Sequence, residues 1–310
     1  MAPSTDVVVD KMVPGTRAVS MVEPTAPRIR WFSRLLRNRN VVLGATIFLL
    51  FLLMAIFANQ ISTHVPTRLD PPQRLKPPSA ANYLGTDEFG RDVYSLVVHG
   101  SRVSLLVGGV TMLFTSLGGT LIGLIAGYYR RLDLVVMRFM DGLMAFPAII
   151  LAIAFMAARG PGVWNVILAL SLVYMPRTAL LVRSTVLSLR ELDYVAAARA
   201  LGRRDFAVAV RHILPNCLAP LLVQGTFIFA YAVLAEAILG FLGVGVPPYV
   251  PSWGNVIASG KNVIREALWV SLFPGITLTV AGLSLNLLGD GLRDTLDPRL
   301  RGSVGTGTGR

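Results

Sequence analysis

Few side chains in this sequence could do chemistry, and none of them show a catalytic or metal-binding spacing. Cys217 is the single cysteine, which excludes an internal disulfide and a cysteine-rich metal site. The three histidines, His64, His99 and His212, lie far apart and form no HExxH motif. No GxSxG motif and no GxxxxGKS or GxxxxGKT phosphate loop occurs, and SGKN at 259–262 is no substitute for one. We therefore expect no catalytic residue, metal or cofactor in this chain.

Polar side chains inside apolar segments are the next candidates, because burying them in a membrane is costly. Glu236, within LAEAILG, could face a translocation path or pair with a partner helix. Arg138 and Asp141 are spaced i, i+3, which favours a local ion pair over a latch to another segment. Asn286 and Asp290, near the end of the last apolar segment, could cap that helix or act as a latch.

These polar residues lie in a chain that is mostly apolar. Of its 310 residues, 54% are hydrophobic and 15% are charged, whereas about a quarter of a soluble domain is charged. About 20 apolar residues cross a bilayer, and each span must be a helix because lipid offers no hydrogen-bond partner to an open backbone. The sequence therefore predicts an all-α membrane protein with six spans, at about 41–58, 103–128, 134–157, 163–182, 218–242 and 268–288.

Prolines and glycines predict the shape of these spans. Pro147 should bend the third span, and Pro176 interrupts the fourth, which could end early. Gly119, Gly123 and Gly127 recur every four residues, a spacing that lets membrane helices approach closely. We expect these glycines to serve packing rather than a flexible gate.

Basic residues predict the orientation of the chain. With the N-terminus in the cytoplasm, 21 of the 29 Lys and Arg fall on the cytoplasmic side and eight fall outside. The net charge of +12 then reflects topology in a lipid bilayer, and we expect no nucleic-acid partner. Residues 1–40 are predicted to be a cytoplasmic tail, disordered over 1–27, and 302–310 to be a disordered tail. Residues 41–301 form the six-helix domain between them.

The segment 191–216, between the fourth and fifth spans, combines helical pattern with strong basic charge. Its first half, Glu191 to Leu201, predicts a helix with acids near its start and arginines near its end, as the helix dipole favours. Gly202 suits the left-handed position that ends this helix. Asp205 is predicted to cap a second helix.

The second helix of this segment should bury one apolar face before Pro215 ends it. The residues of that face follow an i, i+4, i+7, i+8 pattern: Phe206, Val210, Ile213 and Leu214. A passive amphipathic helix lying on headgroups is one interpretation. The first helix, however, is rich in alanine, which inserts poorly into lipid and seats closely in a protein groove.

AAARALG followed by RHILPN resembles the EAA loop of permease subunits of ABC importers, with Gly202 and Pro215 at the expected spacing. The resemblance implies a coupling helix that docks on an ATP-binding subunit. Ala196 stands where the family usually has glutamate, so contacts of that acid are absent or supplied by Glu191 or Asp193. The residues implied in coupling are Glu191, Asp193, Tyr194, Ala197, Ala198, Arg199, Gly202, Arg203, Arg204, Asp205 and Pro215.

Three more segments are similar to dipeptide and oligopeptide permeases, specifically to the second subunit of the permease pair. They are LGTDEFGRDVYSLVVHGSRVSL (84–105), GFLGVGVPPYVPSWG (240–254) and NLLGDGLRDTLDPRLR (286–301). Leu96 replaces an arginine often seen in the first of them. The four matches occur in family order, and the resemblance covers roughly residues 35–301.

This resemblance implies the type I permease fold of ABC importers, in a bacterial cell membrane with both termini cytoplasmic. The implied partners are a related second permease, two ATP-binding subunits that hold ATP and Mg²⁺, and an extracytoplasmic substrate-binding protein. The implied substrate is a peptide, although relatives carry nickel complexes, glutathione or another small solute. Outer-face contacts with the binding protein are expected at Asp87, Arg91, Asp92, Pro251 and Trp253.

Two other classes of function are compatible with the residues alone. An intramembrane enzyme would need a nucleophile with a base, or paired aspartates such as Asp141 and Asp290. A secondary transporter or channel working alone would depend on one acid near mid-depth, without evident repeat symmetry.

Overall fold

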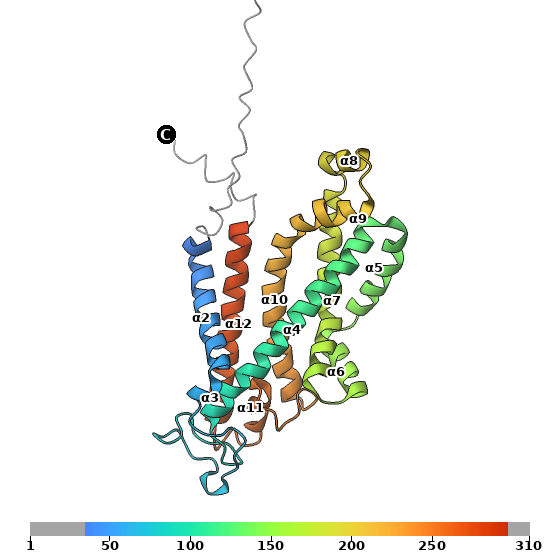
Figure 1. Ribbon diagram of the computed structural model, residues 1–310. Coiled ribbons are helices and arrows are strands. Elements are labelled where there is room, and N and C mark those ends of the chain that lie inside the picture. Colours follow the sequence, from blue (N-terminus) through green and yellow to red (C-terminus); the bar gives the residue numbers. More distant parts are fainter. Residues whose placement is uncertain (1–34, 297–310) are drawn as a thin grey trace, which may run out of the picture.

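The computed structural model describes residues 35–296, and most of these are helical (Figure 1). Within them, the helices long and apolar enough to cross a membrane are α2 (Arg39–Ile56), α4 (Val93–Tyr128), α7 (Val163–Leu189), α10 (Leu214–Phe241) and α12 (Trp269–Leu296). The pair α5 (Arg130–Met144) and α6 (Ala148–Arg159) qualifies as one further span, bent by 91°. Counting this bent pair as one span, the predicted six-span, all-α membrane protein is confirmed.

Short helices form the connections at the two ends of the bundle (Figure 1). At one end, called the loop end, lie α3 (Ala58–Ile61), η1 (Pro71–Gln73) and α11 (Trp253–Ser259). At the other, called the hairpin end, lie α8 (Asp193–Ala200), α9 (Asp205–Val208) and the π-helical turn η2 (Ala209–Ile213). The start of α2 and the end of α12 also lie at the hairpin end. The tails predicted at 1–27 and 302–310 lie outside the described residues.

The helix α4 starts at Val93 rather than at the predicted Val103, and its early start has a local cause. Asp92 precedes it in an extended conformation. The Asp92 carboxylate accepts hydrogen bonds from the backbone N–H of Ser95 at 2.8 Å and from its hydroxyl at 2.7 Å. A capping aspartate satisfies N–H groups that a helix start leaves without partners. Hydropathy, on which the prediction depended, does not register such a cap.

The two interior prolines have opposite effects. The chain turns sharply at Pro147, as predicted, because proline donates no hydrogen bond and forces the residue before it towards an extended conformation. Pro176 lies inside α7, which continues to Leu189, so the expectation that the fourth span ends early is wrong. Side chains on both sides of Pro176, including Val173 and Ala179, are buried against neighbouring helices. This packing holds α7 together across the missing hydrogen bond.

The helices α4 and α7 approach closely along the glycine stripe. A Cβ atom added at Gly123 would lie 2.5 Å from the carbonyl oxygen of Ala179, and one at Gly127 would lie 2.7 Å from Val186 Cβ. Gly119 meets α7 in the same way. The predicted packing role of these glycines is confirmed.

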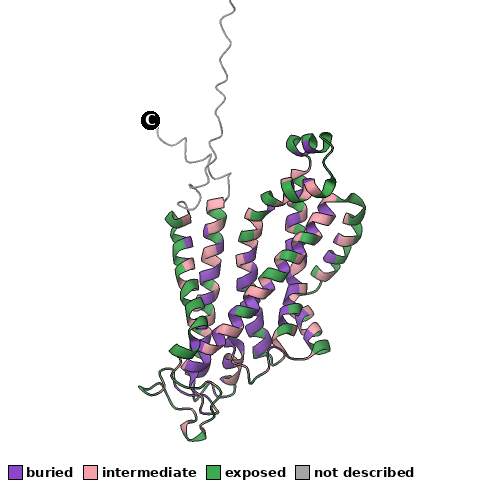
Figure 2. Cartoon of the chain, viewed as in Figure 1, coloured by how far each residue is buried: buried purple, intermediate pink, exposed green. Residues whose placement is uncertain are grey.

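The apolar core lies where α4 crosses α7 and α10, with a second cluster at the loop end. Ile167, Leu170 and Leu239 are buried in the first cluster, and Trp253 and Val270 in the second. Figure 2 shows buried residues along α4, α7 and α10, while α2 is mostly exposed. The exposed side of α2 is apolar, as a lipid-facing helix requires.

Candidate functional site

The basic segment predicted at 191–216 forms a hairpin of α8, a turn and α9, which projects at one end of the bundle (Figure 1). Its first helix is shorter than predicted, running from Asp193 to Ala200. Asp193 lies in its first turn and Arg199 in its last, as the helix dipole favours. Gly202 has a φ of +76°, the left-handed conformation predicted for the residue that ends this helix.

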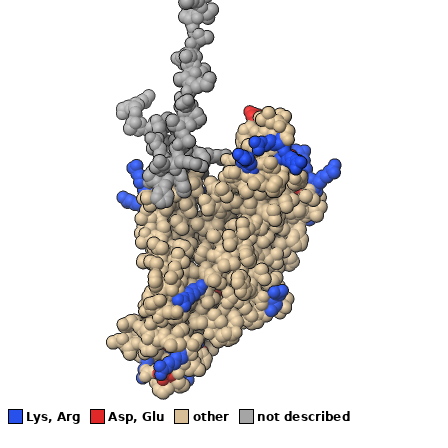
Figure 3. All heavy atoms as spheres, in the orientation of Figure 1, with Lys and Arg blue, Asp and Glu red and all other residues tan. Residues whose placement is uncertain are grey.

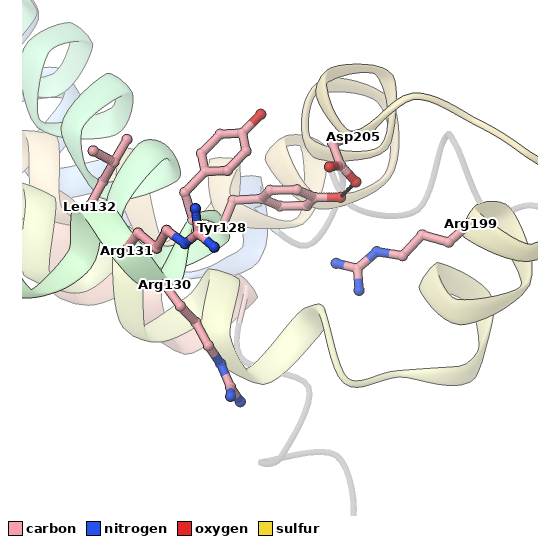
Figure 4. A pocket seen from close by; sticks show the side chains of 7 residues that line it. Tyr128, Arg130, Arg131, Leu132, Arg199 and Asp205 are labelled. Atoms are coloured by element: carbon pink, nitrogen blue, oxygen red, sulfur yellow. Dashed lines mark hydrogen bonds between the residues drawn. The ribbon is translucent and has the colours of Figure 1, made fainter.

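Asp205 does not cap the second helix, contrary to prediction. The helix α9 begins at Asp205 itself, and no side chain caps it. The carboxylate of Asp205 instead accepts a hydrogen bond of 2.6 Å from the hydroxyl of Tyr128, at the end of α4 (Figure 4). The guanidinium of Arg199 lies 5.2 Å from the centre of the Tyr128 ring. Both arms of the hairpin therefore contact the end of α4 through one side chain.

Pro215 does not end the second helix either, since α10 starts at Leu214 and runs through it. The π-helical turn η2 precedes it, and the helix is continuous from Asp205 to Phe241. A proline ring clashes with the carbonyl four residues earlier and donates no hydrogen bond to it. A wide π turn at this place relieves that clash, which is why the helix survives.

The π turn also changes which residues are buried. Val208, Ile213 and Cys217 are buried, at spacings of five and four residues. Phe206 is 75% exposed and Val210 is 41% exposed, so the predicted apolar face is wrong at these two residues, whereas Ile213 is buried as predicted. That face assumed the α-helical period, which does not hold across a π turn.

The helix α8 has two different faces. Val195 and Ala198 are buried in a cluster with side chains of α7 and α10, and they fix the hairpin to the bundle. On an adjacent face, Tyr194 and Leu201 are 42% and 84% exposed, and Ala197 lies between them at the i, i+3, i+7 spacing. The Tyr194 hydroxyl donates to the carbonyl oxygen of His212 at 3.5 Å. Ala197 and Leu201 are exposed, so the hairpin presents an outward face with small and apolar side chains.

Arginines surround this outward face. Arg203 and Arg204, in the turn, are exposed. Arg190 donates to the carbonyl oxygen of Gly127 at 2.9 Å, and its Nε lies 3.0 Å from the carboxylate of Glu191, which is exposed. Figure 3 shows Lys and Arg gathered over the hairpin end, in agreement with the predicted asymmetry of basic charge.

The residues expected on the outer face lie at the loop end, and three of them are buried in the fold. Asp87 is 0% exposed and accepts hydrogen bonds from two backbone N–H groups and from Arg91 Nε at 2.7 Å. Asp92 caps α4, and the indole of Trp253 donates to a carbonyl of α4 at 3.0 Å. Asp87, Asp92 and Trp253 therefore stabilise this end and offer no free surface to another protein. Contact there stays a prediction only for Arg91 and Pro251, which are partly exposed.

Glu236 is 0% exposed and lies buried among the helices of the chain. Its carboxylate accepts a hydrogen bond of 2.8 Å from Ser104, whose oxygen also accepts one of 3.2 Å from the backbone N–H of Trp253. The second carboxylate oxygen has no partner among the described residues. Ser104 was missed because a lone serine in an apolar helix carries no spacing signal. The arrangement ties α4, α10 and α11 together.

The ion pair predicted between Arg138 and Asp141 does not form, and both side chains are exposed. The ion pair of this region joins Arg183 of α7 to Asp133 of α5, with 2.7 Å between Arg183 Nη2 and Asp133 Oδ2. The i, i+3 rule predicted a pair within one helix, whereas the structure makes the pair between two helices. A latch role for Arg138 or Asp141 stays a prediction.

The last span contributes Asn286, which is partly buried, and Asp290, which is exposed. Their predicted capping or latch role stays a prediction. Asp290 lies on α12 and Asp141 on α5, and these helices lie on opposite sides of the molecule (Figure 1). The aspartate pair that an intramembrane enzyme would need is therefore not assembled.

Comparison with known families agrees with this arrangement. Residues 119–302 match the family described as "Binding-protein-dependent transport system inner membrane component". Residues 27–78 match the "N-terminal TM domain of oligopeptide transport permease C". Together these two families cover most of the described residues.

Individual relatives are similar along nearly their whole length. A putative peptide transport system permease protein of Brucella abortus is 48% identical over 276 residues, covering 89% of this chain and 93% of the relative. The dipeptide transport system permease protein DppC of Alkalihalophilus pseudofirmus is 42% identical over 271 residues, covering 87% and 89%. The glutathione transport system permease protein GsiD of Pectobacterium atrosepticum is 36% identical over 277 residues, covering 89% and 92%.

A solved structure shares the fold. A chain of the MetNI methionine ABC transporter, in an inward-facing conformation, superposes with a TM-score of 0.54 at 20% identity, covering 65% of this chain and 96% of that one. This structural likeness, at 20% identity, shows the fold alone. The family matches and the relatives at 42% and 48% identity show the family. The chain belongs to the family of binding-protein-dependent transport system inner membrane components, as a permease of the dipeptide and oligopeptide group of ABC importers.

Proposed function

We propose that this chain is the second permease subunit of an ATP-driven importer of peptides. A peptide permease and a dipeptide permease are among its relatives at 48% and 42% identity, whereas a glutathione permease is 36% identical. Glutathione, itself a small peptide, is therefore the weaker alternative, and nothing in the described residues favours a nickel complex. The chain would form half of the translocation pathway, and a related second permease would form the other half.

One observation carries this proposal: the hairpin has one face built into the bundle and one face left open. Val195, Ala198 and Val208 fix it to α7 and α10, while Leu201 and Phe206 are 84% and 75% exposed. An exposed apolar surface outside the spans favours contact with a protein or with the membrane surface. An ATP-binding subunit is the partner that the family relationship supplies for such a surface.

The open face is also suited to a rigid contact. The outward residues of α8 include Ala197, whose small side chain lets another protein approach the helix backbone. Arg203 and Arg204 flank this face and would pair with acids of the partner. Since an acid at position 196 is missing in this chain, Glu191 and Asp193 would supply the contacts of opposite sign.

The mechanism follows from this attachment. ATP and Mg²⁺ would bind to the two partner subunits, and closure of these subunits would push the hairpin as a unit. The displacement would reach α4 through Tyr128 and α10 through the continuous helix from Asp205. A nucleotide state must favour one packing of the spans by about 5.5 kcal/mol to shift their population from 1:99 to 99:1. An extracytoplasmic binding protein would deliver the peptide at the loop end, and both termini would lie in the cytoplasm.

The test is to place a charge on the open face. Leu201→Glu with Phe206→Glu should abolish copurification of the ATP-binding subunits, because two carboxylates would have to be desolvated in the contact. Tyr249→Glu is the matched control, since Tyr249 is 74% exposed at the loop end. If the double variant retains its ATP-binding subunits as the control does, the hairpin is not the docking site.

The substrate needs its own experiment. The intact importer in proteoliposomes, supplied with its binding protein and ATP, should accumulate a mixture of dipeptides and oligopeptides identified by mass spectrometry. Uptake of glutathione in preference to that mixture would favour the alternative substrate and leave the coupling proposal intact.

A further inference from the structure

A groove of about 570 Å³ lies where α4, α5 and the hairpin meet. Arg130 and Arg131, at the start of α5, and Arg199, from α8, line it (Figure 4). Tyr128 forms its inner wall, and Leu132 lies at its edge. Arg199 and Asp205 are also among the residues predicted to act in coupling, whereas the other five residues that line the groove are not among those predicted for coupling or for the translocation path.

The groove carries a net positive charge. None of its three arginines forms an ion pair with an acid of the described residues. The one carboxylate that lines it, Asp205, accepts the hydrogen bond of Tyr128 through Oδ1. The helix α5, 15 residues long, begins at Arg130 without a side-chain cap, so its first N–H groups add positive potential. An anion is therefore the complementary ligand.

An apolar strip leaves the groove along α5. Leu132, Val135 and Phe139 follow the i, i+3, i+7 spacing of one helix face, and they are 47%, 68% and 62% exposed. Leu132 belongs both to the groove and to the strip. A small free anion would leave this strip uncovered, whereas an amphipathic anion would cover both parts.

The position of the groove fits an amphipathic ligand. It lies at the hairpin end, where α2 begins and α12 ends (Figure 1). Because the apolar spans end at this level, we expect the headgroups of a surrounding bilayer here. Tyr129, 43% exposed, stands beside it, as aromatic residues do at a membrane interface. Basic pockets between helices on this side of a bilayer bind phospholipid headgroups.

We propose that this groove binds an anionic phospholipid. Arg130, Arg131 and Arg199 hold the phosphate, and one acyl chain lies along the strip of Leu132, Val135 and Phe139. Because Arg199 belongs to α8 and Arg130 to α5, the headgroup joins the hairpin to the bundle. This site is separate from the open face proposed to receive the ATP-binding subunit.

The test measures lipid binding to the intact importer in detergent, by native mass spectrometry with phosphatidylglycerol as the probe. Arg130→Gln with Arg131→Gln should weaken binding about thirtyfold, or about 2 kcal/mol at 1.4 kcal/mol per tenfold, since each basic residue contributes about 1 kcal/mol. The matched control is Arg37→Gln with Arg39→Gln, an exposed pair at the same end of the bundle, which should leave binding unchanged. Equal binding by the groove variant and the wild type overturns the proposal.

Two further arms identify the ligand. Phosphatidylcholine should not compete, and inorganic phosphate should not displace phosphatidylglycerol; displacement by inorganic phosphate would mean a free-anion site and overturn the proposal. A photoreactive residue in place of Val135 should label lipid in the intact importer. Labelling of the second permease instead would show that a protein covers the strip, and it would equally overturn the proposal.

Discussion

The hydroxyl of Tyr128 donates a hydrogen bond of 2.6 Å to the carboxylate of Asp205. Tyr128 is the last residue of α4 and Asp205 the first of α9, so this bond joins a span to the hairpin. The glycine stripe holds α4 tightly against α7, which leaves the end of α4 little freedom. The bond is therefore placed to transmit a displacement of the hairpin into the paired helices.

Removing only the hydroxyl should loosen the hairpin. Tyr128→Phe keeps the ring beneath Arg199 but deletes the bond to Asp205. The loss of about 1 kcal/mol should speed amide hydrogen exchange over 193–208 about fivefold. Tyr129→Phe is the control, since the Tyr129 hydroxyl has no hydrogen-bond partner among the described residues. Indistinguishable exchange in the two variants would contradict the role given to this bond.

The turn of the hairpin allows a test that separates strain from coupling. Gly202 and Gly243 both have a φ of +76°, and a Cβ added to either meets no atom within 4 Å. In each case the next residue donates its backbone N–H to a carbonyl five residues earlier, Arg203 to Ala198 and Val244 to Leu239. Valine at either position should therefore cost a similar amount, about 1–2 kcal/mol, from the positive φ. Gly243 follows the end of α10, the helix whose start joins the hairpin.

Only Gly202→Val should change transport. Reconstituted importers carrying either variant are compared for peptide uptake per ATP hydrolysed. The ratio should fall for Gly202→Val because the hairpin changes shape, and stay at the wild-type value for Gly243→Val. A normal ratio in both variants would show that the shape of the hairpin turn does not matter for coupling.

Hydropathy located the spans because a span depends only on its own segment of the chain. An apolar helix of sufficient length satisfies all its backbone hydrogen bonds within itself, so the composition of the segment is enough to predict that it crosses the membrane. The glycine stripe was also predictable, since its four-residue spacing lies within one helix. The effect of proline on a span was predicted correctly at one position of two. Pro147 breaks its span and Pro176 does not, and the difference arises from packing around α7.

The errors in the hairpin have two causes. The π turn at 209–213 shifts the helical period, so Val208 and Ile213 are buried while Phe206 is exposed. Asp205 looked like a cap because its position was judged within its own helix. Its partner, Tyr128, is 77 residues away. The carboxylate of Asp87 was likewise misread as a surface group, because burial among distant segments decides its role.

The buried hydrogen bonds of Ser104 predict a stability effect. Ser104→Ala removes the donor to Glu236 and the acceptor of the Trp253 N–H, and both groups stay buried. An unsatisfied buried group costs about 1–3 kcal/mol, so the apparent melting temperature in detergent should fall clearly. Ser188→Ala is the control, because Ser188 is exposed and bonds only to its own helix. Equal melting temperatures would contradict the arrangement.

Glu236 itself can be tested for a pathway role. Glu236→Gln keeps the shape of the side chain and an acceptor for Ser104 but removes the charge. Because Glu236 is 0% exposed, peptide uptake by the reconstituted importer should stay near the wild-type rate. A large loss of uptake with unchanged melting temperature would place Glu236 on the path after all.

The glycine stripe predicts opposite effects for one substitution at two positions. Gly123→Ala brings a Cβ to 2.5 Å from the carbonyl oxygen of Ala179, so α4 and α7 must separate, at a cost of about 1–3 kcal/mol. Gly142→Ala, in α5, meets no atom within 4 Å and should stabilise its helix by about 1 kcal/mol. Thermal unfolding of the purified importer measures both. If Gly123→Ala proves as harmless as Gly142→Ala, α4 and α7 do not pack as closely as described. The end of α4 would then be too loosely held to transmit a displacement of the hairpin through Tyr128.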